Sequence, residues 1–254
     1  AMKQVPASEY NPMECIKTNI IGAENVIEAA LDNKVKKIIA LSTDKAAAPI
    51  NIYGASKLCS DKLFIAANNI VGSRDLSISI VRYGNVMGSR GSVIPLFMRL
   101  AKTGVLPITH TEMTRFNITI KEGVGLVLWS LNNTFGGEIV VPKISSYRIL
   151  DVAKAIGPNC KQNIIGLRPG EKLHEKLITV SDSLTTYDIG NYYLILPQSQ
   201  SSDLYISHYN SLNLNLLKVE ENFTYDSGKN SIFLSDLEIR NLIKLNIKDD
   251  FEPI

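Results

Sequence analysis

An apolar run that ends in a polar turn constrains the fold of this chain more than any other stretch. Residues 37–41 read Lys-Ile-Ile-Ala-Leu, and Ser-Thr-Asp-Lys follows at once. A short apolar run of this kind is typical of a buried strand in a parallel sheet. A turn with Pro49 comes next. A helix that begins near Asn51 then places Tyr53 and Lys57 on one face, because residues four apart are neighbours on a helix surface.

The Tyr53–Lys57 pair has a use in catalysis. The reference pKa of tyrosine is about 10, and a nearby cation favours tyrosinate by roughly 1–3 units. Such a base can take the proton of a sugar hydroxyl while a nicotinamide takes the hydride. Tyr-x-x-x-Lys also occurs by chance on many helices, so the pair alone leaves a purely structural role open.

The order of the predicted elements indicates the fold class. A helix over 12–32, the strand at 36–42 and the Tyr/Lys helix form part of a doubly wound sheet. A strand at 76–83 then leads into the glycine-rich turn 84–91 at the carboxyl edge, where open α/β sheets bind ligands. We predict an α/β chain with a partial Rossmann-like doubly wound parallel sheet and a smaller α/β substrate-binding lobe. Residues 1–90 are assigned to the first, and 91–254 mainly to the second, with some segments returning to the sheet.

The second half of the chain gives weaker signals. Helices are predicted at 92–102, 122–132 and 149–156, and strands at 137–141, 164–167 and 192–196. Residues 168–175 are predicted to open a helix, and a polar stretch after residue 196 is predicted to be a loose loop. A capping box at Ser235 and Glu238 predicts a last helix through residue 245.

Composition excludes several classes of protein. The chain has 254 residues, 45% of them hydrophobic and 20% charged, with a net charge of +2. This balance predicts no nucleic-acid or anionic-membrane partner. No apolar run reaches the roughly 18–20 residues of a membrane helix. Cys15, Cys59 and Cys160 are scattered, lack metal-ligand spacing and read as thiols of a reducing, cytoplasmic compartment.

Several motifs in order resemble one branch of the extended short-chain dehydrogenase/reductase superfamily, the inverting UDP-N-acetylglucosamine 4,6-dehydratases. The resemblance covers nearly the whole chain. One departure is Ala48, where the family pattern leads us to expect Asn before the proline. The motifs are Thr43-Asp44-Lys45, the run from Pro49 to Lys57, Arg82-Tyr83-Gly84-Asn85-Val86 and Arg168-Pro169-Gly170-Glu171-Lys172.

The resemblance implies a reaction and a set of roles. Tyr53 with Lys57 would deprotonate the 4-hydroxyl of a UDP-sugar, Lys45 would take the proton from carbon 5, and Asp44 would protonate the leaving 6-hydroxyl. These enzymes use NADP, begin the route to pseudaminic acid in bacteria and form homo-oligomers; no metal is implied. The implied catalytic residues are Thr43, Asp44, Lys45, Tyr53 and Lys57; the cofactor-binding residues are Tyr53, Lys57, Tyr83 and Val86; and the substrate-binding residues are Lys45, Asn85, Arg90, Arg115, Arg168 and Glu171.

One part of a dinucleotide site is missing from the sequence. The Gly-x-Gly-x-x-Gly turn that holds a pyrophosphate is absent, and the nearest glycines, Gly84, Gly88 and Gly91, have the wrong spacing. Compared with the family, a segment on the order of 80 residues is expected before residue 1, so we read the chain as N-terminally truncated.

Two other functions stay open at this point. A sugar-nucleotide 4-epimerase needs the Tyr/Lys pair but no Asp-Lys elimination pair. A non-catalytic nucleotide-sugar-binding fragment needs neither. The dehydratase reading also requires a neutral Lys45 and a protonated Asp44, although their ordinary pKa values, near 10.4 and 3.9, give the opposite charges at neutral pH.

Overall fold

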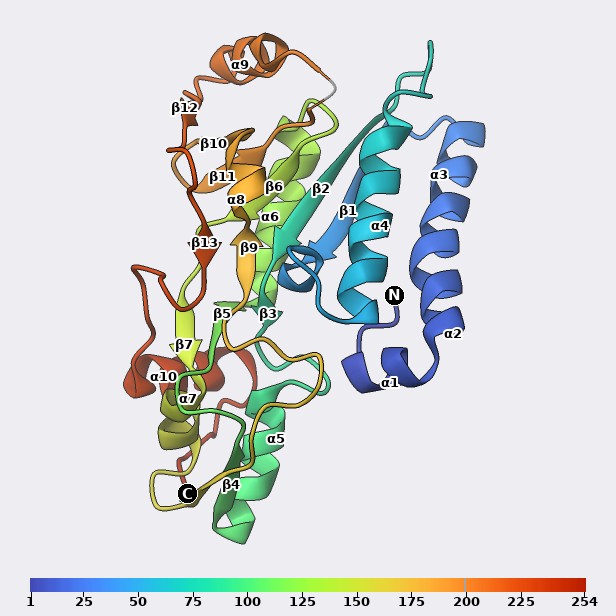
Figure 1. The fold of residues 1–254 in the computed structure, drawn as a ribbon. Helices are drawn as coiled ribbons and strands as arrows, with labels where there is room; N and C mark the ends of the chain where they lie inside the picture. Colours follow the sequence, from blue (N-terminus) through green and yellow to red (C-terminus); the bar gives the residue numbers. More distant parts are fainter. Residues whose placement is uncertain (199) are drawn as a thin grey trace. The chain divides into compact units, whose positions relative to one another are not determined.

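The computed structural model describes residues 1–198 and 200–254, in two compact units (Figure 1). Unit 1 consists of Ala1–Tyr83, Val124–Lys143 and Lys176–Thr224. Unit 2 consists of Gly84–Gly123, Ile144–Glu175 and Tyr225–Ile254. The first division falls after Tyr83 rather than at residue 90, so the glycine-rich turn belongs to unit 2.

The described part of unit 1 is built on a six-stranded sheet with the order β1-β2-β6-β11-β10-β12. β1, β2 and β6 are parallel, β11 is antiparallel to β6, and β10 pairs antiparallel with both β11 and β12. The parallel part confirms the predicted α/β sheet. The strands are β1 (Lys37–Thr43), β2 (Ser77–Tyr83), β6 (Ile139–Pro142), β11 (Tyr192–Ile195), β10 (Thr186–Asp188) and β12 (Leu217–Lys218).

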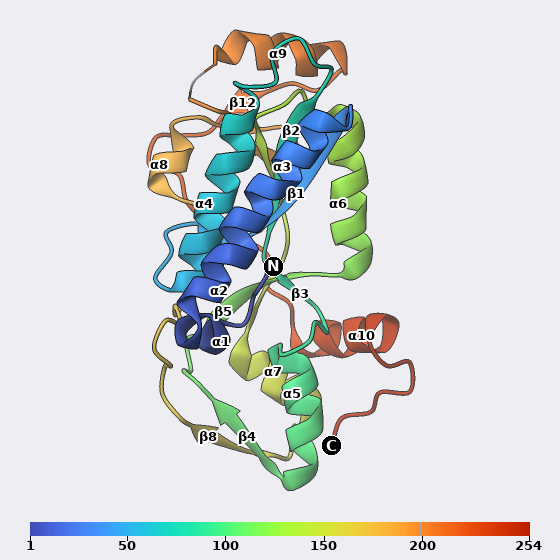
Figure 2. The ribbon, with the colours of Figure 1, turned by 90° about the vertical axis from the view of Figure 1, so that its right-hand side faces the viewer.

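Helices cover both faces of this sheet (Figure 2). α3 and α4 lie on one face and α6 lies on the other. The predicted helix over 12–32 is present, but a π-helical turn interrupts it. The remaining elements of unit 1 are α1 (Val5–Tyr10), α2 (Pro12–Ile16), the π-helix η1 (Lys17–Ile21), α3 (Gly22–Asp32), the 3₁₀ turn η2 (Asp44–Ala46), α4 (Ile52–Ala67), most of α6 (Ile120–Asn133), β9 (Lys176–Ile178), α8 (Val180–Ser183) and α9 (Ser202–Ser211).

Alternation along β2 decides which side chains meet which helix. Val81 packs in a buried cluster with Leu126 of α6 and Val140 of β6. Because successive side chains of a strand point to opposite faces, Ile80 and Arg82 point to the face that α4 covers. Ile80 and Arg82 are both buried. β2 therefore places the apolar Val81 on the side of α6 and carries a charged residue on its other side.

The stretch at 202–211, predicted to be loose, forms helix α9. The Ser201 side chain accepts a hydrogen bond from the Asp203 amide at its start. Tyr205 and Tyr209, one helical turn apart, are fully buried. The Tyr209 hydroxyl donates to Glu138 Oε1 at 2.8 Å. The prediction was wrong because polar composition concealed two tyrosines at helical spacing, whose burial stabilises the helix.

Unit 2 packs short helices and strands around one apolar cluster. Ile94, Phe97, Leu106, Val152 and Ile243 are among its buried members. Its sheets have the orders β3-β5-β7 and β4-β8. Its elements are β3 (Asn85–Val86), α5 (Val93–Leu100), the 3₁₀ turn η3 (Ala101–Thr103), β4 (Val105–Ile108), β5 (Thr114–Ile118), β7 (Ser146–Arg148), α7 (Ile149–Ile156), β8 (Lys161–Ile164), β13 (Tyr225–Asp226) and α10 (Asp236–Asn246).

The predicted start of α10 is confirmed in detail. The Glu238 amide donates to Ser235 Oγ at 3.3 Å, and Glu238 Oε2 accepts from the Ser235 amide at 2.8 Å. This reciprocal pair satisfies two backbone donors that a helix start otherwise leaves open.

The segment around Arg168 differs from its prediction. The strand lies at Lys161–Ile164, not at 164–167, and residues 168–175, all of them described, form no helix. Pro169 follows Arg168, and Gly170 has a left-handed φ of 77°. A residue before proline avoids the helical region, and a left-handed glycine ends a helical path, so a turn forms instead. The Glu171 amide closes it by donating to the Arg168 carbonyl at 3.1 Å.

Within the described residues, none of the helices combines the length and apolar character that crossing a membrane requires.

Candidate active site

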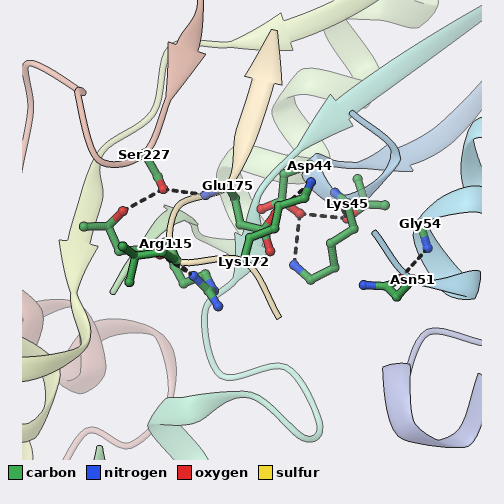
Figure 3. A network of polar contacts seen from close by, with 11 residues as sticks. Asp44, Lys45, Asn51, Gly54, Arg115, Lys172, Glu175 and Ser227 are labelled. Carbon is green, nitrogen blue, oxygen red and sulfur yellow. Dashed lines mark hydrogen bonds and ion pairs between the residues drawn. The ribbon is translucent and has the colours of Figure 1, made fainter. Parts of the chain in front are cut away.

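The end of β1 leads directly into a compact polar cluster (Figure 3). Thr43 Oγ1 accepts from the Lys45 amide at 3.4 Å, which starts the 3₁₀ turn η2, and donates to Asp44 Oδ1 at 2.9 Å. Lys45 Nζ lies 3.1 Å from the same Oδ1. The Asp44 side chain is fully buried, and its Oδ2 has no hydrogen-bond partner within the described residues. The turn therefore holds a carboxylate out of solvent with one oxygen directed at a cation.

Helix α4 begins close by and carries the predicted pair. Asn51 Oδ1 accepts from the Gly54 amide at 2.8 Å, so the helix start lies at the predicted residue. Tyr53, in the first turn, is buried and hydrogen-bonded to Thr43. Lys57 follows one turn later and is also buried. Tyr53, Thr43, Asp44 and Lys45 thus lie in one cluster.

The electrostatics of Tyr53 run against the simple expectation from sequence. Burial raises the pKa of Tyr53, while the hydrogen bond with Thr43 and the charge of Lys45 oppose this rise. Burial likewise lowers the pKa of Lys57, and the carboxylate of Asp61 opposes it. The cation that favours tyrosinate here is Lys45. The family resemblance assigns Lys45 to a different step, the removal of the proton from carbon 5.

Gly54 is required by the close approach of the turn to the helix. A Cβ at this position would lie 2.3 Å from the Lys45 carbonyl oxygen. This distance is far below a van der Waals contact, so any side chain would displace the backbone that carries Lys45. The close approach of the turn therefore explains why a glycine follows Tyr53, which the Tyr-x-x-x-Lys pattern does not specify.

Two buried polar side chains, Asn19 beside α4 and Asp61 on α4, were not predicted. Asn19, in the π-helix η1, donates through Nδ2 to Ser56 Oγ at 2.9 Å, and Ser56 Oγ donates to the Tyr53 carbonyl at 2.8 Å. π-turns inside helices often occur at functional sites. An asparagine inside an apolar helical pattern is the available signal. On the other side of α4, Asp61 meets a serine and an arginine of the sheet.

Unit 2 carries the remaining candidates. Asn85 and Val86 form the short strand β3 and are half-buried, whereas Arg90 is exposed. Arg115 on β5 is buried, and its Nη1 donates to the Thr114 carbonyl and to the Leu173 carbonyl at 3.1 Å. Arg115 therefore anchors backbone in this structure, a role that the sequence did not suggest.

The loop after Leu173 is fixed by hydroxyl groups. Thr114 Oγ1 lies 2.8 Å from His174 Nδ1 and 2.8 Å from Ser227 Oγ, and Ser227 Oγ accepts from the Glu175 amide at 2.9 Å. Figure 3 shows the hydrogen bond between Ser227 and Glu175. Arg168 is exposed, and its Nη1 lies 4.0 Å from Glu171 Oε1. The described residues contain no group of three or more His, Cys, Asp or Glu side chains arranged to hold a metal ion.

The chain matches known proteins over most of its length. Residues 1–197 match the model of a family described as polysaccharide biosynthesis protein. An inverting UDP-N-acetylglucosamine 4,6-dehydratase of Campylobacter jejuni is 51% identical over 250 residues, which cover 96% of this chain and 74% of that protein. A UDP-glucose 4-epimerase of Rickettsia typhi is 40% identical over 254 residues, 98% of this chain and 70% of that protein. The solved structure of Pen from Bacillus thuringiensis is 36% identical, with a TM-score of 0.83 over 96% of this chain and 73% of that one.

Proposed function

Because the chain belongs to the family of polysaccharide biosynthesis proteins, we propose that it carries the catalytic residues of an inverting UDP-N-acetylglucosamine 4,6-dehydratase, a lyase. The observation that carries this proposal is the cluster in which Thr43 joins Tyr53 to the buried Asp44–Lys45 pair. The 51% identity to the Campylobacter dehydratase supports it over 96% of the chain.

Each residue of the cluster has a proton to hold or move. Tyr53 takes the proton of the 4-hydroxyl when carbon 4 is oxidised, and Lys57 assists it. The ketone makes the hydrogen on carbon 5 acidic, and Lys45 removes it. Asp44 protonates the 6-hydroxyl as it leaves. Addition of a proton to carbon 5 from the opposite face then gives the inverted 4-keto-6-deoxy sugar.

The Asp44–Lys45 hydrogen bond offers a route to the charge states that this scheme needs. Elimination needs a neutral amine and a protonated acid, whereas an ion pair holds the proton on Lys45. Transfer of that one proton from Lys45 to Asp44 along the 3.1 Å contact converts the ion pair into the neutral pair. The Asp44 carboxyl group that would receive this proton is fully buried. After elimination Lys45 holds the carbon-5 proton and Asp44 is a carboxylate, so the ion pair is restored.

The described residues fit the reactive end of a nicotinamide cofactor, which we propose to be NADP. Thr43 and Tyr83 are register partners at the carboxyl ends of β1 and β2, and Tyr53 and Lys57 stand on the helix that follows. Tyr53, Lys57, Tyr83 and Val86 would hold it. A bound nicotinamide supplies hydride acceptance from carbon 4 and hydride return to carbon 6.

Substrate contacts are proposed from the candidates of unit 2. Lys45, Asn85 and Arg90 would contact the sugar, while Arg115 and Arg168 would bind the diphosphate and Glu171 the ribose. A planar guanidinium matches phosphate geometry, which supports the two arginines. We further infer a cytoplasmic homo-oligomer that supplies the first step of pseudaminic acid synthesis. Three free cysteines are in keeping with that compartment.

A 4-epimerase is the second candidate, because the 40% identical relative from Rickettsia typhi is named UDP-glucose 4-epimerase. An epimerase returns the hydride to carbon 4 and has no elimination step. The Asp44–Lys45 pair would then have no proton to move at carbons 5 and 6, which favours the dehydratase.

The test is product analysis with the protein as its gene encodes it. UDP-N-acetylglucosamine in deuterated water should give a 4-keto-6-deoxy sugar with deuterium at carbon 5. Tyr53→Phe should abolish oxidation at carbon 4, with a loss of about 10²–10⁴ in rate. Lys45→Ala should keep oxidation and lose the exchange of the carbon-5 hydrogen. Wild-type exchange in Lys45→Ala would refute Lys45 as the base, and a carbon-4 epimer as the product would favour the second candidate.

A further inference from the structure

Beneath α4, three polar side chains from three elements meet in the interior of unit 1. Ser42 Oγ on β1 donates to Asp61 Oδ2 on α4 at 2.6 Å, and Arg82 Nη2 on β2 lies 3.6 Å from the same oxygen. Their exposed fractions are 4%, 2% and 3%. The strand register explains the meeting, because Ser42 is the register partner of Arg82 in the β1–β2 ladder. Both donors therefore reach the same carboxylate.

Asp61 also lies one helical turn after Lys57, on the same face of α4. Lys57 is buried, and burial lowers its pKa, which the charge of Asp61 opposes. Burial raises the pKa of Asp61, and the charges of Arg82 and Lys57 and the hydrogen bond from Ser42 oppose this rise. Asp61 thus stands between two buried cations.

The far side of Arg82 is also tied down. Its Nη1 donates to the Leu177 carbonyl at 3.3 Å and lies 3.3 Å from Asp182 Oδ2. The four groups Lys57, Asp61, Arg82 and Asp182 carry two positive and two negative charges, so this cluster, buried except for the partly exposed Asp182, is neutral as a whole. A neutral cluster lowers the free energy needed to keep Lys57 charged away from water.

We propose that Asp61 is the counter-ion that keeps Lys57 protonated beside Tyr53, and that Ser42 and Arg82 are the positioning residues that hold its carboxylate there. This proposal rests on the proposed function for its catalytic meaning, because it explains how Lys57 stays charged while it assists Tyr53. The arrangement itself is a property of unit 1 and does not depend on substrate.

The proposal makes a prediction for pH. Tyr53 and Asp61 each lie one helical turn from Lys57 on α4; Arg82 on β2 contacts Asp61, and Asp44 and Lys45 in η2 act on Tyr53. Asp61 raises the pKa of Lys57 against the effect of burial. Without its charge, burial and the positive charge of Arg82 act in the same direction. Lys57 then loses its proton at a lower pH, and activity that requires the ammonium is lost at that lower pH.

The test is a titration of Lys57 by NMR in the protein as its gene encodes it, with ¹³C at the lysine ε-carbons. Lys57→Arg assigns the signal. Asp61→Asn should lower the titration midpoint of Lys57 by roughly one to three pH units, the effect of one nearby opposite charge. Asp182→Asn is the matched control. It removes a carboxylate from the same cluster on the far side of Arg82, and should move the midpoint much less.

Two outcomes would overturn the proposal: an unchanged midpoint in Asp61→Asn, or an equal fall in Asp182→Asn. Asp61→Asn leaves the charge of Arg82 buried without its partner, and the variant could fail to fold for that reason. In that case the double variant Asp61→Asn/Arg82→Met, which removes both charges, is compared with Arg82→Met. The midpoint should be lower in the double variant. An equal midpoint in these two variants would also refute the proposal.

Activity gives a second readout that separates this proposal from the proposed function. In Asp61→Asn the alkaline limb of the kcat/KM profile should move to lower pH in parallel with the titration of Lys57, and Asp61→Glu should restore it. A moved titration without dehydratase activity in the wild type would refute the proposed function and support the counter-ion. Dehydratase activity in the wild type with an unchanged Lys57 midpoint in Asp61→Asn would support the proposed function and refute the counter-ion.

Discussion

Ala48 holds a backbone conformation that costs free energy in an alanine. Its φ is 48°, in the left-handed region. This conformation costs a residue with a Cβ roughly 1–2 kcal/mol, and asparagine adopts it more readily than alanine. The family pattern leads one to expect asparagine at this position, and the backbone now supplies the physical reason.

Ala48→Asn should therefore raise the free energy of unfolding by about 1 kcal/mol. Urea denaturation measures the change. Ala66→Asn is the control, because Ala66 is exposed on α4, where asparagine should instead lower stability by up to about 0.7 kcal/mol. Equal destabilisation by both substitutions would show that the left-handed backbone stores no strain that asparagine relieves.

Arg168 offers a test of nucleotide binding. Its side chain is exposed and its nearest carboxylate oxygen, on Glu171, is 4.0 Å away, so it is not committed to a strong internal ion pair. Arg168→Ala should weaken UDP and UDP-sugar binding equally, by tenfold or more, since a charge-assisted hydrogen bond contributes about 1.5–3 kcal/mol. Calorimetry with UDP measures it. The exposed Arg99 on α5 provides the control, and equal affinities in Arg168→Ala and Arg99→Ala would make Arg168 a turn residue only.

Individual site residues were predictable where function leaves a local pattern. Tyr53 and Lys57 stand four apart, so their spacing brought them to attention, and the family resemblance added Thr43, Asp44 and Lys45 after the strand. Their catalytic roles remain predictions. Ser42, Asp61 and Arg82 lie far apart in the sequence and meet only through strand register, which no local pattern contains.

Two helical glycines should respond in opposite ways to the same substitution. Gly54 in α4 would place a Cβ 2.3 Å from the Lys45 carbonyl oxygen, whereas Gly125 in α6 has open space around it. Gly54→Ala should lower the free energy of unfolding by about 1–3 kcal/mol, as overpacking does. Gly125→Ala should raise it by about 0.5–1 kcal/mol, because alanine is the better helix former. A stable Gly54→Ala protein with an undisturbed Lys45 would contradict the close approach.

Regular elements were predictable where periodicity and capping agree. β1 has an apolar run, and the helices α4 and α10 have capping residues at Asn51 and Ser235. The failures have separate causes. Pro169 and Gly170 turn the chain where charge had suggested a helix, and the polar surface of α9 concealed its buried tyrosines. The π-turn at 17–21 has no signal, because it depends on how Asn19 meets Ser56.

The chain as a whole carries the residues that we propose for a nicotinamide site, but not a phosphate-binding turn. Residues 1–254 contain no Gly-x-Gly-x-x-Gly sequence. The pyrophosphate site of a Rossmann fold needs the backbone N–H groups of that turn. The 254-residue polypeptide by itself should therefore not bind NADP at micromolar concentration in calorimetry. A cooperative unfolding transition in the same sample is the control for folding, and micromolar binding would place the phosphate site elsewhere.

Each unit is assembled from three separate stretches of the sequence. During synthesis on the ribosome, β1 and β2 emerge early, but β6 follows after residue 138, and the outermost strand β12 waits for residue 218. Tyr53 and Lys57 are thus translated long before the sheet beside them is complete. Until β6 is made, the described part of the sheet beside their helix is incomplete, and apolar surface is open to other chains. The nascent chain should accordingly depend on chaperones for nearly its whole length, and slow decoding before residue 218 should lower the yield of folded protein.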